Sequence, residues 1–509
     1  MITNSNNLEN DIKVSLKNLK SGTDIRGIAI ETEEHKISLT CEIISLIGYG
    51  FSKWLKNKTN NKTNLKVAIG MDSRLSGPKL KETLKEVLTM DGIFVYDCGI
   101  STTPSMFMTT ILEKYSCDGA IMITASHLPY YYNGIKFFTS QGGCEEGDID
   151  EILALANIVE DTRFSDTKGK VEEVQLIEDY SSLLVNKVIK EVNNQKPLEG
   201  CKIIVDAGNG AGGFFVDKVL KPLGANVEGS QFLEPDGTFP NHIPNPENKE
   251  AMESIKKAVL NSKADLGIIF DTDVDRAAVV SKTGEEINKN ALIALISSIL
   301  VRENKGKDNG ITIVTDSITS TGLTEFITNM NCVHHRFKRG YKNVINEAKR
   351  LNEEGIDCPL AIETSGHAAL RENFFLDDGA YIVVKILIEM SRLKKENKDI
   401  DDLIKDLKHA FESYEKRIKI NCDDFRKYGE CVIEDLKGYV SKIDGWSIEP
   451  KNYEGIKINC NKESGWFLFR LSLHEPVFVL NIESDVEDGV KSILSKFNDF
   501  IKNYKDLGI

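Results

Sequence analysis

Three segments of the chain follow one pattern, in which an apolar run leads into aspartate and small residues and then into a helical stretch. They are NLKVAIGMDSRLSG (64–77), CKIIVDAGNGAGG (201–213) and ITIVTDSITSTG (311–322). This order is typical of a strand, a tight turn and a helix. The pattern predicts three related α/β units, and their irregular spacing argues against a solenoid.

Two further strands are predicted in each unit. The second strands are GIFVYDCG (92–99), ANVEGSQF (225–232) and NCVHHRFK (331–338). The third strands are GAIMITASH (119–127), LGIIFDTDVDR (266–276) and LAIETSGH (360–367). Short apolar strands that alternate with helices predict mixed or parallel sheets covered by helices on both faces. Ligands of such sheets bind beyond the carboxyl ends of the strands, so the polar residues that end the third strands are candidates for a site.

The chain from about residue 411 onward has a different pattern. Lys, Asp and Glu are frequent there, and GWFLFRLSLHEPVFVLNIES (465–484) alternates as antiparallel strands do. A length of 509 residues suits three or four domains. We therefore expect an α/β protein with three related α/β domains, each on a mixed sheet, and a smaller α+β C-terminal domain. The expected bounds are 1–172, 173–287, 288–410 and 411–509.

The composition narrows the class of protein. The chain is 41% hydrophobic and 28% charged, as ordinary globular proteins are. No apolar run approaches the roughly 20 residues of a membrane span, and the start MITNSNNLENDIK lacks the apolar core of a signal peptide. The ten cysteines stand singly without a CxxC pair, which suits reduced thiols in the cytoplasm. A formal charge of −14 disfavours nucleic acid, so we expect neither a membrane nor nucleic acid as partner, and a phosphorylated small molecule stays open.

The stretch DTDVDR is a candidate metal site. Asp271, Asp273 and Asp275 alternate after the apolar run LGIIF. If the chain stays extended there, the three carboxylates point the same way, and a hard divalent cation relieves their repulsion. An EF-hand is excluded, because Arg276 and Lys282 stand where its glycine and glutamate belong. A solvated acidic turn is the alternative.

The stretch ETSGH is a candidate for binding a sugar. Glu363, Ser365 and His367 alternate in it, so in an extended chain they also share one side. Such a trio is suited to hydrogen bonds with neighbouring hydroxyls of a sugar. Capping of the next helix is an equal alternative.

Two basic stretches are candidates for holding a phosphate. RFKRGYK (336–342) places four cations around Gly340. RLSLHEP alternates Arg470, Ser472 and His474, and an arginine binds phosphate through two parallel hydrogen bonds. For each stretch, a basic surface that is only solvated is the alternative.

The glycine-rich turn over 208–213 fits G-x-G-x-x-G after a strand. Glu228 lies about 20 residues beyond the first glycine, as in dinucleotide-binding proteins. The related units carry Asp-Ser at this place instead. We therefore interpret the glycines as a tight turn from strand to helix and keep a nucleotide site as the alternative.

A serine–histidine pair, Ser126 and His127, follows the apolar run of the first unit in TASHLPYYYNGIK. Alone, such a pair indicates no more than a turn at the end of a strand. It is, however, one of six stretches that occur in order: SGTDIRG, TASHLPYYYNGIK, DTDVDR, GYK, ETSGH and RLSLHEP. Together, and over nearly the whole chain, they resemble the α-D-phosphohexomutase family, the phosphoglucomutase and phosphomannomutase enzymes.

The resemblance implies a fold and a reaction. The four domains would surround a central cleft, in which phosphate moves between O1 and O6 of a hexose phosphate, glucose and/or mannose. Ser126 would carry a phosphoryl group, and Mg²⁺ would be held by that phosphate and by Asp271, Asp273 and Asp275. Transfer from Ser126 would give a hexose 1,6-bisphosphate, which returns its other phosphate to the serine. Positioning and charge neutralisation are what such a transfer needs.

The resemblance also implies roles for the other candidates. Lys136 and Arg26 would handle protons or position groups beside the serine, and His127 would orient the serine loop. Arg276 would offset negative charge on the transferring group. The remaining substrate-binding candidates are Gly340, Tyr341 and Lys342, Glu363 and Ser365 at the sugar hydroxyls, His367 as a second acid or base, and Arg470, Ser472 and His474 at the phosphate that does not react.

Four positions depart from the residues usual in that family. Leu128 replaces an asparagine after the serine-loop histidine, and Ile318 stands where many members have a lysine that faces the substrate. In the phosphate loop, Leu473 and His474 replace asparagine and threonine. These positions bear on the substrate more than on the reaction, so a phosphoglucosamine mutase stays an alternative. A phosphoserine-dependent sugar-phosphate phosphatase and a silent sugar-phosphate-binding protein are alternatives of other classes.

Overall fold

The computed structural model describes residues 16–157, 167–304, 310–472 and 475–508, which fall into two units. The first unit extends to Asn288 and includes two later segments, 365–369 and 373–400. The second contains 289–364, 370–372 and the chain from Asp401 onward. The chain therefore passes from one unit to the other inside ETSGH, between Thr364 and Ser365.

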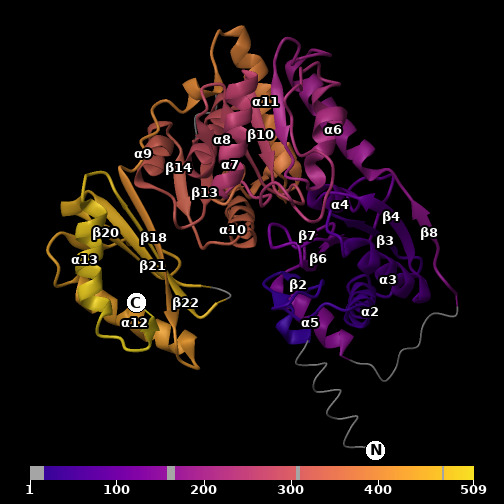
Figure 1. Cartoon of the computed structure of the whole chain (residues 1–509), viewed down its shortest axis with the longest axis horizontal. Coiled ribbons are helices and arrows are strands. Elements are labelled where there is room, and N and C mark those ends of the chain that lie inside the picture. Colours follow the sequence, from indigo (N-terminus) through magenta and orange to yellow (C-terminus); the bar gives the residue numbers. More distant parts are fainter. Residues whose placement is uncertain (1–15, 158–166, 305–309, 473–474, 509) are drawn as a thin grey trace, which may run out of the picture. The chain divides into compact units, whose positions relative to one another are not determined.

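The first unit begins with an eight-stranded sheet of order β1-β2-β6-β5-β3-β4-β8, with β7 beside β6 (Figure 1). Its strands are β1 (Lys20–Ser21), β2 (Asp24–Ile28), β3 (Lys66–Met71), β4 (Phe94–Ile100), β5 (Gly119–Ile123), β6 (Tyr132–Thr139), β7 (Gly142–Gly143) and β8 (Val171–Glu173). Its helices are α2 (Cys41–Lys58), α3 (Gly77–Met90), α4 (Thr103–Met108) and α5 (Glu146–Ala156). β3 is parallel to β4 and β5, whereas β6 is antiparallel to β5 and β2, so the sheet is mixed. The serine loop connects the neighbouring strands β5 and β6.

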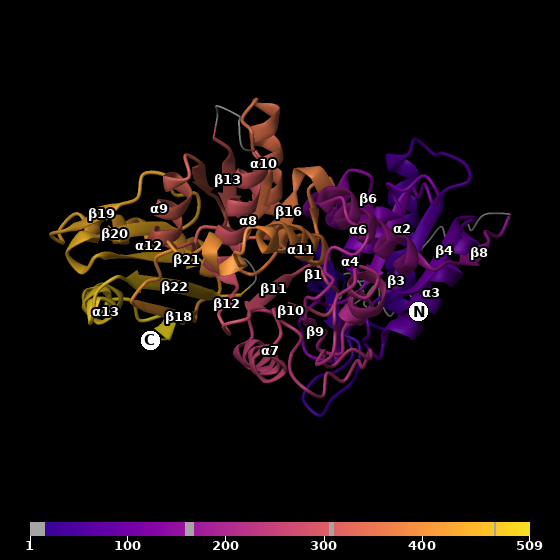
Figure 2. The ribbon, with the colours of Figure 1, turned by 90° about the horizontal axis from the view of Figure 1, so that it is seen from above.

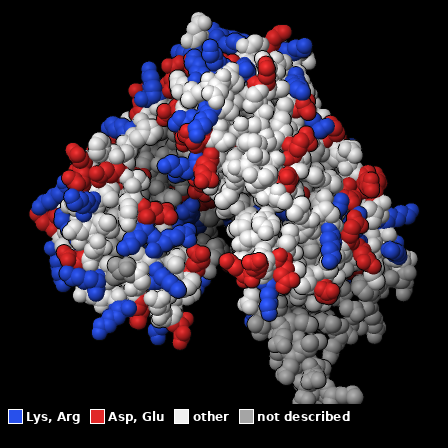
Figure 3. Space-filling model, viewed as in Figure 1, with Lys and Arg blue, Asp and Glu red and all other residues white. Residues whose placement is uncertain are grey.

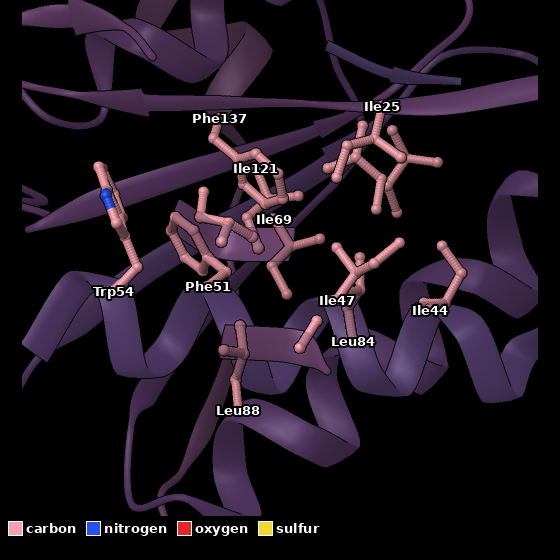
Figure 4. Packing of buried hydrophobic residues seen from close by; sticks show 14 of the residues in the cluster. Ile25, Ile44, Ile47, Phe51, Trp54, Ile69, Leu84, Leu88, Ile121 and Phe137 are labelled. Atoms are coloured by element: carbon pink, nitrogen blue, oxygen red, sulfur yellow. The ribbon is translucent and has the colours of Figure 1, made fainter. Parts of the chain in front are cut away.

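Helices α2 and α3 pack on this sheet and form the core of the domain (Figure 4). α2 begins after Thr40, whose hydroxyl oxygen accepts a hydrogen bond from a backbone N–H of the first turn. Its residues Ile44, Ile47 and Phe51 recur at helical spacing and are fully buried. Phe51 stacks on Phe137 of β6 with ring centroids 4.6 Å apart. Each such side chain contributes about 1.5–3 kcal/mol by leaving water, and the packing fixes the strands on both sides of the serine loop.

The second sheet of this unit has the order β12-β11-β10-β9. Its strands are β9 (Ile203–Asp206), β10 (Leu266–Phe270), β11 (Ala277–Ser281) and β12 (Glu286–Ile287). The unit also contains α6 (Leu176–Val192), α7 (Lys249–Ser262), α11 (Gly379–Lys395) and the short turns η2 (Ala211–Gly213) and η3 (Val216–Leu220). β9 and β10 are parallel, and β10 pairs with β11 in the antiparallel sense. The aspartate stretch is therefore the turn that joins β10 to β11.

The strand predicted over 225–232 is wrong. The stretch makes only two isolated bridges to the region of β9. Gly229 has a φ of 105°, and the N–H of Ser230 donates back to the carbonyl of Val227 at 3.2 Å, so the chain turns there. Glycine adopts this backbone conformation readily, and its presence interrupts the strand.

In the second unit, β13 lies between β14 and β15 and is parallel to both. These strands are β13 (Thr312–Thr315), β14 (Val333–Arg336) and β15 (Leu360–Ile362). β16 (Ala368–Leu370) and β17 (Leu376–Asp377) follow along the chain, largely in the two segments that belong to the first unit. The helices are α8 (Lys289–Glu303), α9 (Thr321–Asn329) and α10 (Tyr341–Glu353). None of the helices in the described ranges is long and apolar enough to cross a membrane.

The C-terminal domain is built on an antiparallel sheet of order β19-β20-β21-β22-β18-β23 (Figure 2). Its strands are β18 (Glu412–Ile420), β19 (Trp446–Ile448), β20 (Ile456–Cys460), β21 (Gly465–Leu471), β22 (Val477–Ser484) and β23 (Leu507–Gly508). Helices α12 (Phe425–Val440) and α13 (Gly489–Ile501) share one apolar core with this sheet. Figure 3 shows Lys and Arg side chains gathered on the visible face of this domain. With the three preceding α/β sheets, this domain confirms the predicted fold class.

Candidate active site

The serine loop begins where β5 ends, and its backbone is strained at the serine. Ser126 has a φ of 50°, in the left-handed region that non-glycine residues rarely adopt. Its N–H donates to the hydroxyl oxygen of Thr124 at 2.9 Å, and the whole residue is only 3% exposed. A conformation of this kind costs on the order of 1–3 kcal/mol and persists where the surroundings hold it, as they often do at functional sites.

The Ser126 hydroxyl meets charged groups of the second sheet. Its Oγ lies 3.2 Å from Asp271 Oδ2, 3.2 Å from Arg276 Nη2 and 3.3 Å from His127 Nδ1. Asp271 is fully buried, and Arg276 is 1% exposed. The structure thus brings together, in one unit, a serine and an aspartate that are 145 residues apart in the sequence.

The three aspartates gather on a tight turn and not on an extended chain, so that expectation was wrong. Val274 between them has a φ of 65°, which is unusual for a β-branched residue. The turn still collects the carboxylates: one ligand atom each from Asp271, Asp273 and Asp275 lies within 4.8 Å of the others. The turn closes through the N–H of Arg276, which donates to Asp271 Oδ1 at 3.1 Å.

The charges of this turn are only partly balanced by the protein. Burial, together with Asp275 and Asp273, raises the pKa of Asp271 well above its usual range. Burial opposes the charge of Asp275 too, but Lys136, His367 and Arg276 outweigh it and lower that pKa. Lys136 Nζ lies 3.1 Å from Asp273 Oδ2 and 2.5 Å from Asp275 Oδ2.

Two carboxylate oxygens of the turn are buried and accept no hydrogen bond from the described residues. They are Asp273 Oδ1 and Asp275 Oδ1. A buried anionic oxygen without a donor is costly, and coordination of a hard cation removes that cost. The donor set, three carboxylates within 4.8 Å, consequently fits a divalent cation that prefers oxygen ligands.

His127 is held as a neutral imidazole. Arg276 Nη2 donates to its Nδ1 at 2.7 Å, so this nitrogen is the acceptor and the ring proton is on Nε2. Burial and the positive charges of Arg276 and Arg26 lower the pKa of His127 to about 2. While that bond is made, the lone pair of Nδ1 is not free to take the serine proton, which agrees with an orienting role.

Arg26 and His367 belong to the same charged surroundings. Arg26 lies on β2 opposite Gly134 of β6, and its Nη2 donates to Asp24 Oδ2 at 2.8 Å. His367 Nδ1 bonds to the Asp377 carboxylate and lies 3.9 Å from Asp275 Oδ1. Although burial opposes the charge, these two carboxylates raise the pKa of His367 to about 9, so it is a cation at neutral pH.

A functional candidate that the sequence analysis missed is Arg74, in the turn after β3. It is 1% exposed, and its guanidinium donates to backbone carbonyls of the serine loop, including that of Ser126 at 2.5 Å. The only signal in the sequence is comparative. The first of the three related turns reads DSRL, with an arginine, where the others read DAGN and DSIT.

In the second unit, the glutamate of ETSGH meets the glycine of GYK. Glu363 Oε1 accepts a hydrogen bond from the N–H of Gly340 at 2.6 Å. Gly340 has a φ of 117° and precedes α10, whose first turn contains Tyr341 and Lys342. The structure thus joins two stretches that were separate candidates. Glu363 binds the residue that precedes α10, and the helix that follows ETSGH, α11, is capped by Asp378.

The expectation of an extended chain through ETSGH was also wrong. Gly366 has a φ of 95°, and residues 364–366 turn. Glu363 therefore remains in the second unit, while Ser365 and His367 belong to the first. A residue with positive φ reverses the chain, and side chains two positions apart then no longer share a side.

Arg470 lies near the end of β21 with a glutamate beside it. Arg470 is 7% exposed, and its Nε lies 3.8 Å from Glu454 Oε1. The same oxygen accepts hydrogen bonds from the Ser317 hydroxyl and, at 3.3 Å, from the N–H of Arg339. Glu454 was not among the predicted site residues, because it stands 16 positions from Arg470 in a loop without a motif.

The phosphate loop beyond β21 is described only in part. The N–H of Ser472 donates to the carbonyl of Val477 at 2.9 Å, and its hydroxyl accepts from the N–H of Glu475 at 3.3 Å. The predicted contributions of Leu473 and His474 lie outside the described residues.

The glycines of the G-x-G-x-x-G stretch serve close packing. A Cβ on Gly210 would lie 2.7 Å from the carbonyl oxygen of Thr272, and one on Gly213 would lie 2.1 Å from that of Leu233. A Cβ on Gly208 would meet Pro244 at 2.7 Å. The space beside these glycines is filled by the domain itself, which confirms the tight turn and disagrees with a nucleotide site.

Comparison with known proteins identifies the family. Models of the α/β/α domains I, II and III of phosphoglucomutase/phosphomannomutase match residues 17–162, 178–284 and 288–411. A phosphoglucomutase of Neisseria gonorrhoeae is 30% identical over 484 residues, which cover 94% of this chain and 96% of that protein. A phosphomannomutase/phosphoglucomutase of Pseudomonas aeruginosa is 30% identical over 484 residues, 94% of each chain.

A solved structure supports the same assignment. The crystal structure of a phosphoglucomutase/phosphomannomutase family protein from Burkholderia thailandensis superposes with a TM-score of 0.76 at 26% identity. The superposition covers 96% of this chain and 97% of that one. The chain therefore belongs to the phosphoglucomutase/phosphomannomutase family of phosphohexomutase enzymes.

Proposed function

We propose that the protein moves phosphate reversibly between O1 and O6 of a hexose phosphate, glucose and/or mannose, through phospho-Ser126 and a hexose 1,6-bisphosphate. One observation carries the proposal. Ser126 Oγ lies 3.2 Å from both Asp271 and Arg276, in the unit where the other two aspartates each keep a buried oxygen without a donor. A serine beside acidic cation ligands and an arginine has the surroundings that phosphoryl transfer needs.

We propose that the cation is Mg²⁺, held by Asp271, Asp273, Asp275 and the phosphate on Ser126. When bound, it would supply neutralisation of the phosphoryl charge. Three carboxylate ligands leave positions for phosphate oxygen, as Mg²⁺ usually requires. Arg276 would bind the phosphoryl group from its position 3.2 Å from Ser126 Oγ.

Phosphoryl transfer also requires that protons move, and the protein's own residues have to move them. In the first transfer, the bond from phosphorus to Ser126 Oγ breaks and a bond from phosphorus to a sugar hydroxyl oxygen forms. The hydroxyl proton has to pass to a base, and we assign that role to Lys136 Nζ in its neutral form. Arg26, which stays protonated, is assigned to positioning the hydroxyl or the phosphate beside the serine. His367 is protonated at neutral pH and is the acid of the proposal, while neutral His127 keeps the loop and Arg276 in place.

We assign the parts of the substrate that do not react to the remaining candidates, of which Ser365 belongs to the first unit and the others to the second. Glu363 and Ser365 are assigned to sugar hydroxyls, and Gly340, Tyr341 and Lys342 to the substrate beside them. The remaining phosphate is assigned to Arg470, Ser472 and His474. Arg470 supports this assignment, because its guanidinium is nearly buried and its Nε has no hydrogen-bond partner in the described chain.

A coupled assay with Mg²⁺ and a trace of glucose 1,6-bisphosphate tests the proposal. Glucose 1-phosphate and mannose 1-phosphate are compared by kcat/KM, and glucosamine 1-phosphate is the third substrate. Ser126→Ala should abolish turnover, whereas Ser116→Ala, an exposed serine of the same domain that also has a positive φ of 47°, should leave it unchanged. Release of free phosphate without isomerisation would replace the mutase with a phosphatase.

We also propose a cytoplasmic location and the four domain bounds 1–172, 173–287, 288–410 and 411–509. The location is supported by the ten cysteines, all within the described ranges and all without a disulfide. Cell fractionation tests the location, and limited proteolysis with mass spectrometry of the fragments tests the bounds. Fragments that begin within a few residues of 173, 288 and 411 are expected.

A further inference from the structure

The guanidinium of Arg74 binds the serine loop through four backbone carbonyls. Its Nη2 donates to the carbonyl of Ser126 at 2.5 Å and to that of Leu128 at 2.6 Å. Its Nη1 donates to the carbonyl of Pro129 at 2.8 Å and to that of Tyr132 at 2.9 Å. One side chain thus fixes the backbone from the serine to the first residue of β6.

This arrangement depends on the shape of arginine. The guanidinium is a rigid planar fork with five donors, so it can reach several carbonyls in fixed directions. A lysine ammonium is one point charge with three donors on a flexible stem. It cannot hold four carbonyls spread over seven residues with the same geometry.

Arg74 is itself held from other sides. Its N–H donates to Asp72 Oδ1 at 2.9 Å, and its Nε lies 3.3 Å from the other oxygen of that carboxylate. The ring of Phe239 covers the guanidinium, with 5.2 Å from Cζ to the ring centroid. Gly237 packs against the backbone of this turn, where an added Cβ would lie 2.5 Å from Leu75 N.

We infer that Arg74 is a positioning residue for phosphoryl transfer: it holds Ser126 in its left-handed conformation, with Oγ facing Asp271 and Arg276. The strained φ of 50° has to be stabilised by neighbours, and Arg74 binds the carbonyl of that same residue. If the loop relaxes, the serine turns to an ordinary conformation and its Oγ moves away from both groups. The inference rests on the proposed mutase function and adds a residue that acts through the backbone alone.

Arg74→Lys tests the inference, with kcat and KM measured separately. A misplacement of the nucleophile by about 1 Å lowers the rate about 100-fold, so we expect kcat to fall by about that factor. KM for glucose 1-phosphate should change less than about twofold, because Arg74 is not proposed to touch the sugar. Amide hydrogen exchange of peptides covering 124–132 should become faster in the variant.

Two further variants keep the test decisive. Asp72→Asn keeps the guanidinium but loosens it, and should lower kcat by about tenfold with the same KM. Lys81→Met removes a buried ion pair with Asp97, 2.6 Å long, in the same domain, and should lower the melting temperature while kcat stays unchanged. If Arg74→Lys fails to fold, the Asp72 variant alone decides.

The outcomes separate this inference from the proposed function. An Arg74→Lys enzyme with wild-type kcat, or with loop exchange unchanged, overturns the positioning role and leaves the mutase standing. A wild-type protein without turnover on any sugar phosphate overturns the mutase instead. In that case the exchange of 124–132 still supports the hold of Arg74 on the loop if it increases, and overturns it if it does not.

Discussion

The two units hold their candidate site residues in different ways. In the first, Ser126, Asp271 and Arg276 are each at most 3% exposed and contact one another directly, although they come from two sheets. In the second, Arg470 and the N–H of Arg339 face the carboxylate of Glu454. The first region is a network of buried reactive groups, whereas the second pairs its donors with an anion that the chain itself supplies.

The difference matches two chemical tasks. A reacting group benefits from dipoles and charges that are fixed before the substrate arrives. The fixed charged groups of the first region reduce its stability. Burial and two neighbouring carboxylates disfavour the charge of Asp271 and raise its pKa well above the usual range. A phosphate-binding group has to exchange one anion for another, and Glu454 gives the donors of the second region a partner until that exchange occurs.

Asp273→Asn should give the largest effect. The change removes the charge of one proposed cation ligand, so we expect kcat to fall about 100- to 1,000-fold at saturating Mg²⁺. The melting temperature should change little, because the relief of repulsion among three carboxylates offsets the loss of the charge opposite Lys136 Nζ, 3.1 Å away. Asp97→Asn is the matched control, since this buried aspartate pairs with Lys81 and Lys85 away from the site. The control should have a lower melting temperature and an unchanged kcat. If both variants changed kcat and the melting temperature in the same way, the aspartates of the first region would have no special role in the reaction.

Arg470→Met should act on binding and not on the chemical step. Loss of charge-assisted hydrogen bonds of about 1.5–3 kcal/mol raises KM for the sugar phosphate about 10- to 100-fold. We expect kcat to remain within about threefold, because the reacting serine lies in the other unit's network. Steady-state kinetics measure both constants, and Arg426→Met, an exposed arginine of the same domain, is the control. A fall in kcat with unchanged KM would contradict the assignment of Arg470 to the phosphate.

Glu454→Gln should have a smaller effect of the opposite sign. The amide oxygen still accepts from Ser317 and Arg339, but the negative charge next to Arg470 is gone. Repulsion of an incoming phosphate then weakens, and we expect KM to fall about fivefold with kcat unchanged. Glu434→Gln is the control, since Glu434 pairs with Lys437 of α12 at 2.6 Å and neither residue is assigned to the substrate. A higher KM in the Glu454 variant would show that the carboxylate orients Arg470 for substrate and does not compete with it.

The sequence identified residue types and their order along the chain well. Apolar runs followed by Ser126 or by the three aspartates are local signals, and strands of an α/β sheet bring their polar ends to one side. The backbone turns were not predictable in the same way. Residue preferences oppose a positive φ at Ser126 and Val274, so only the surrounding structure decides it.

Residues that bind backbone groups or distant loops were also not predictable from the sequence. Arg74 binds carbonyls, which every residue has, so no partner residue type marks its target. Glu454 meets its partners only after β13, β20 and β21 have been placed, and no local pattern reports that. The strand expected over 225–232 failed for a local reason, a glycine with positive φ, which the apolar spacing around it had concealed.

Glu483 of β22 provides the smallest expected effect, on stability alone. Its Oε2 accepts a hydrogen bond from Trp466 Nε1 at 3.1 Å, and burial raises its pKa to about 7 against the opposing charge of Lys457. The folded state therefore holds this proton more tightly than the unfolded state, whose pKa is about 4.3. The stabilisation is present below pH of about 4 and is lost as the pH rises through about 7.

Glu483→Gln removes that titration. Between pH 5 and pH 8, the free energy of unfolding of the wild type should fall by about 1 kcal/mol more than that of the variant, with solvent screening allowed for. Urea unfolding followed by tryptophan fluorescence measures it, because two of the three tryptophans, Trp446 and Trp466, lie in this domain. Glu487→Gln, an exposed carboxylate nearby, should follow the wild type. If the free energy of unfolding changes with pH equally in the wild type and in Glu483→Gln, the protein balances the charge of buried Glu483 as fully as it balances that of Glu454. Buried carboxylates without a balancing charge would then occur in the reactive region alone.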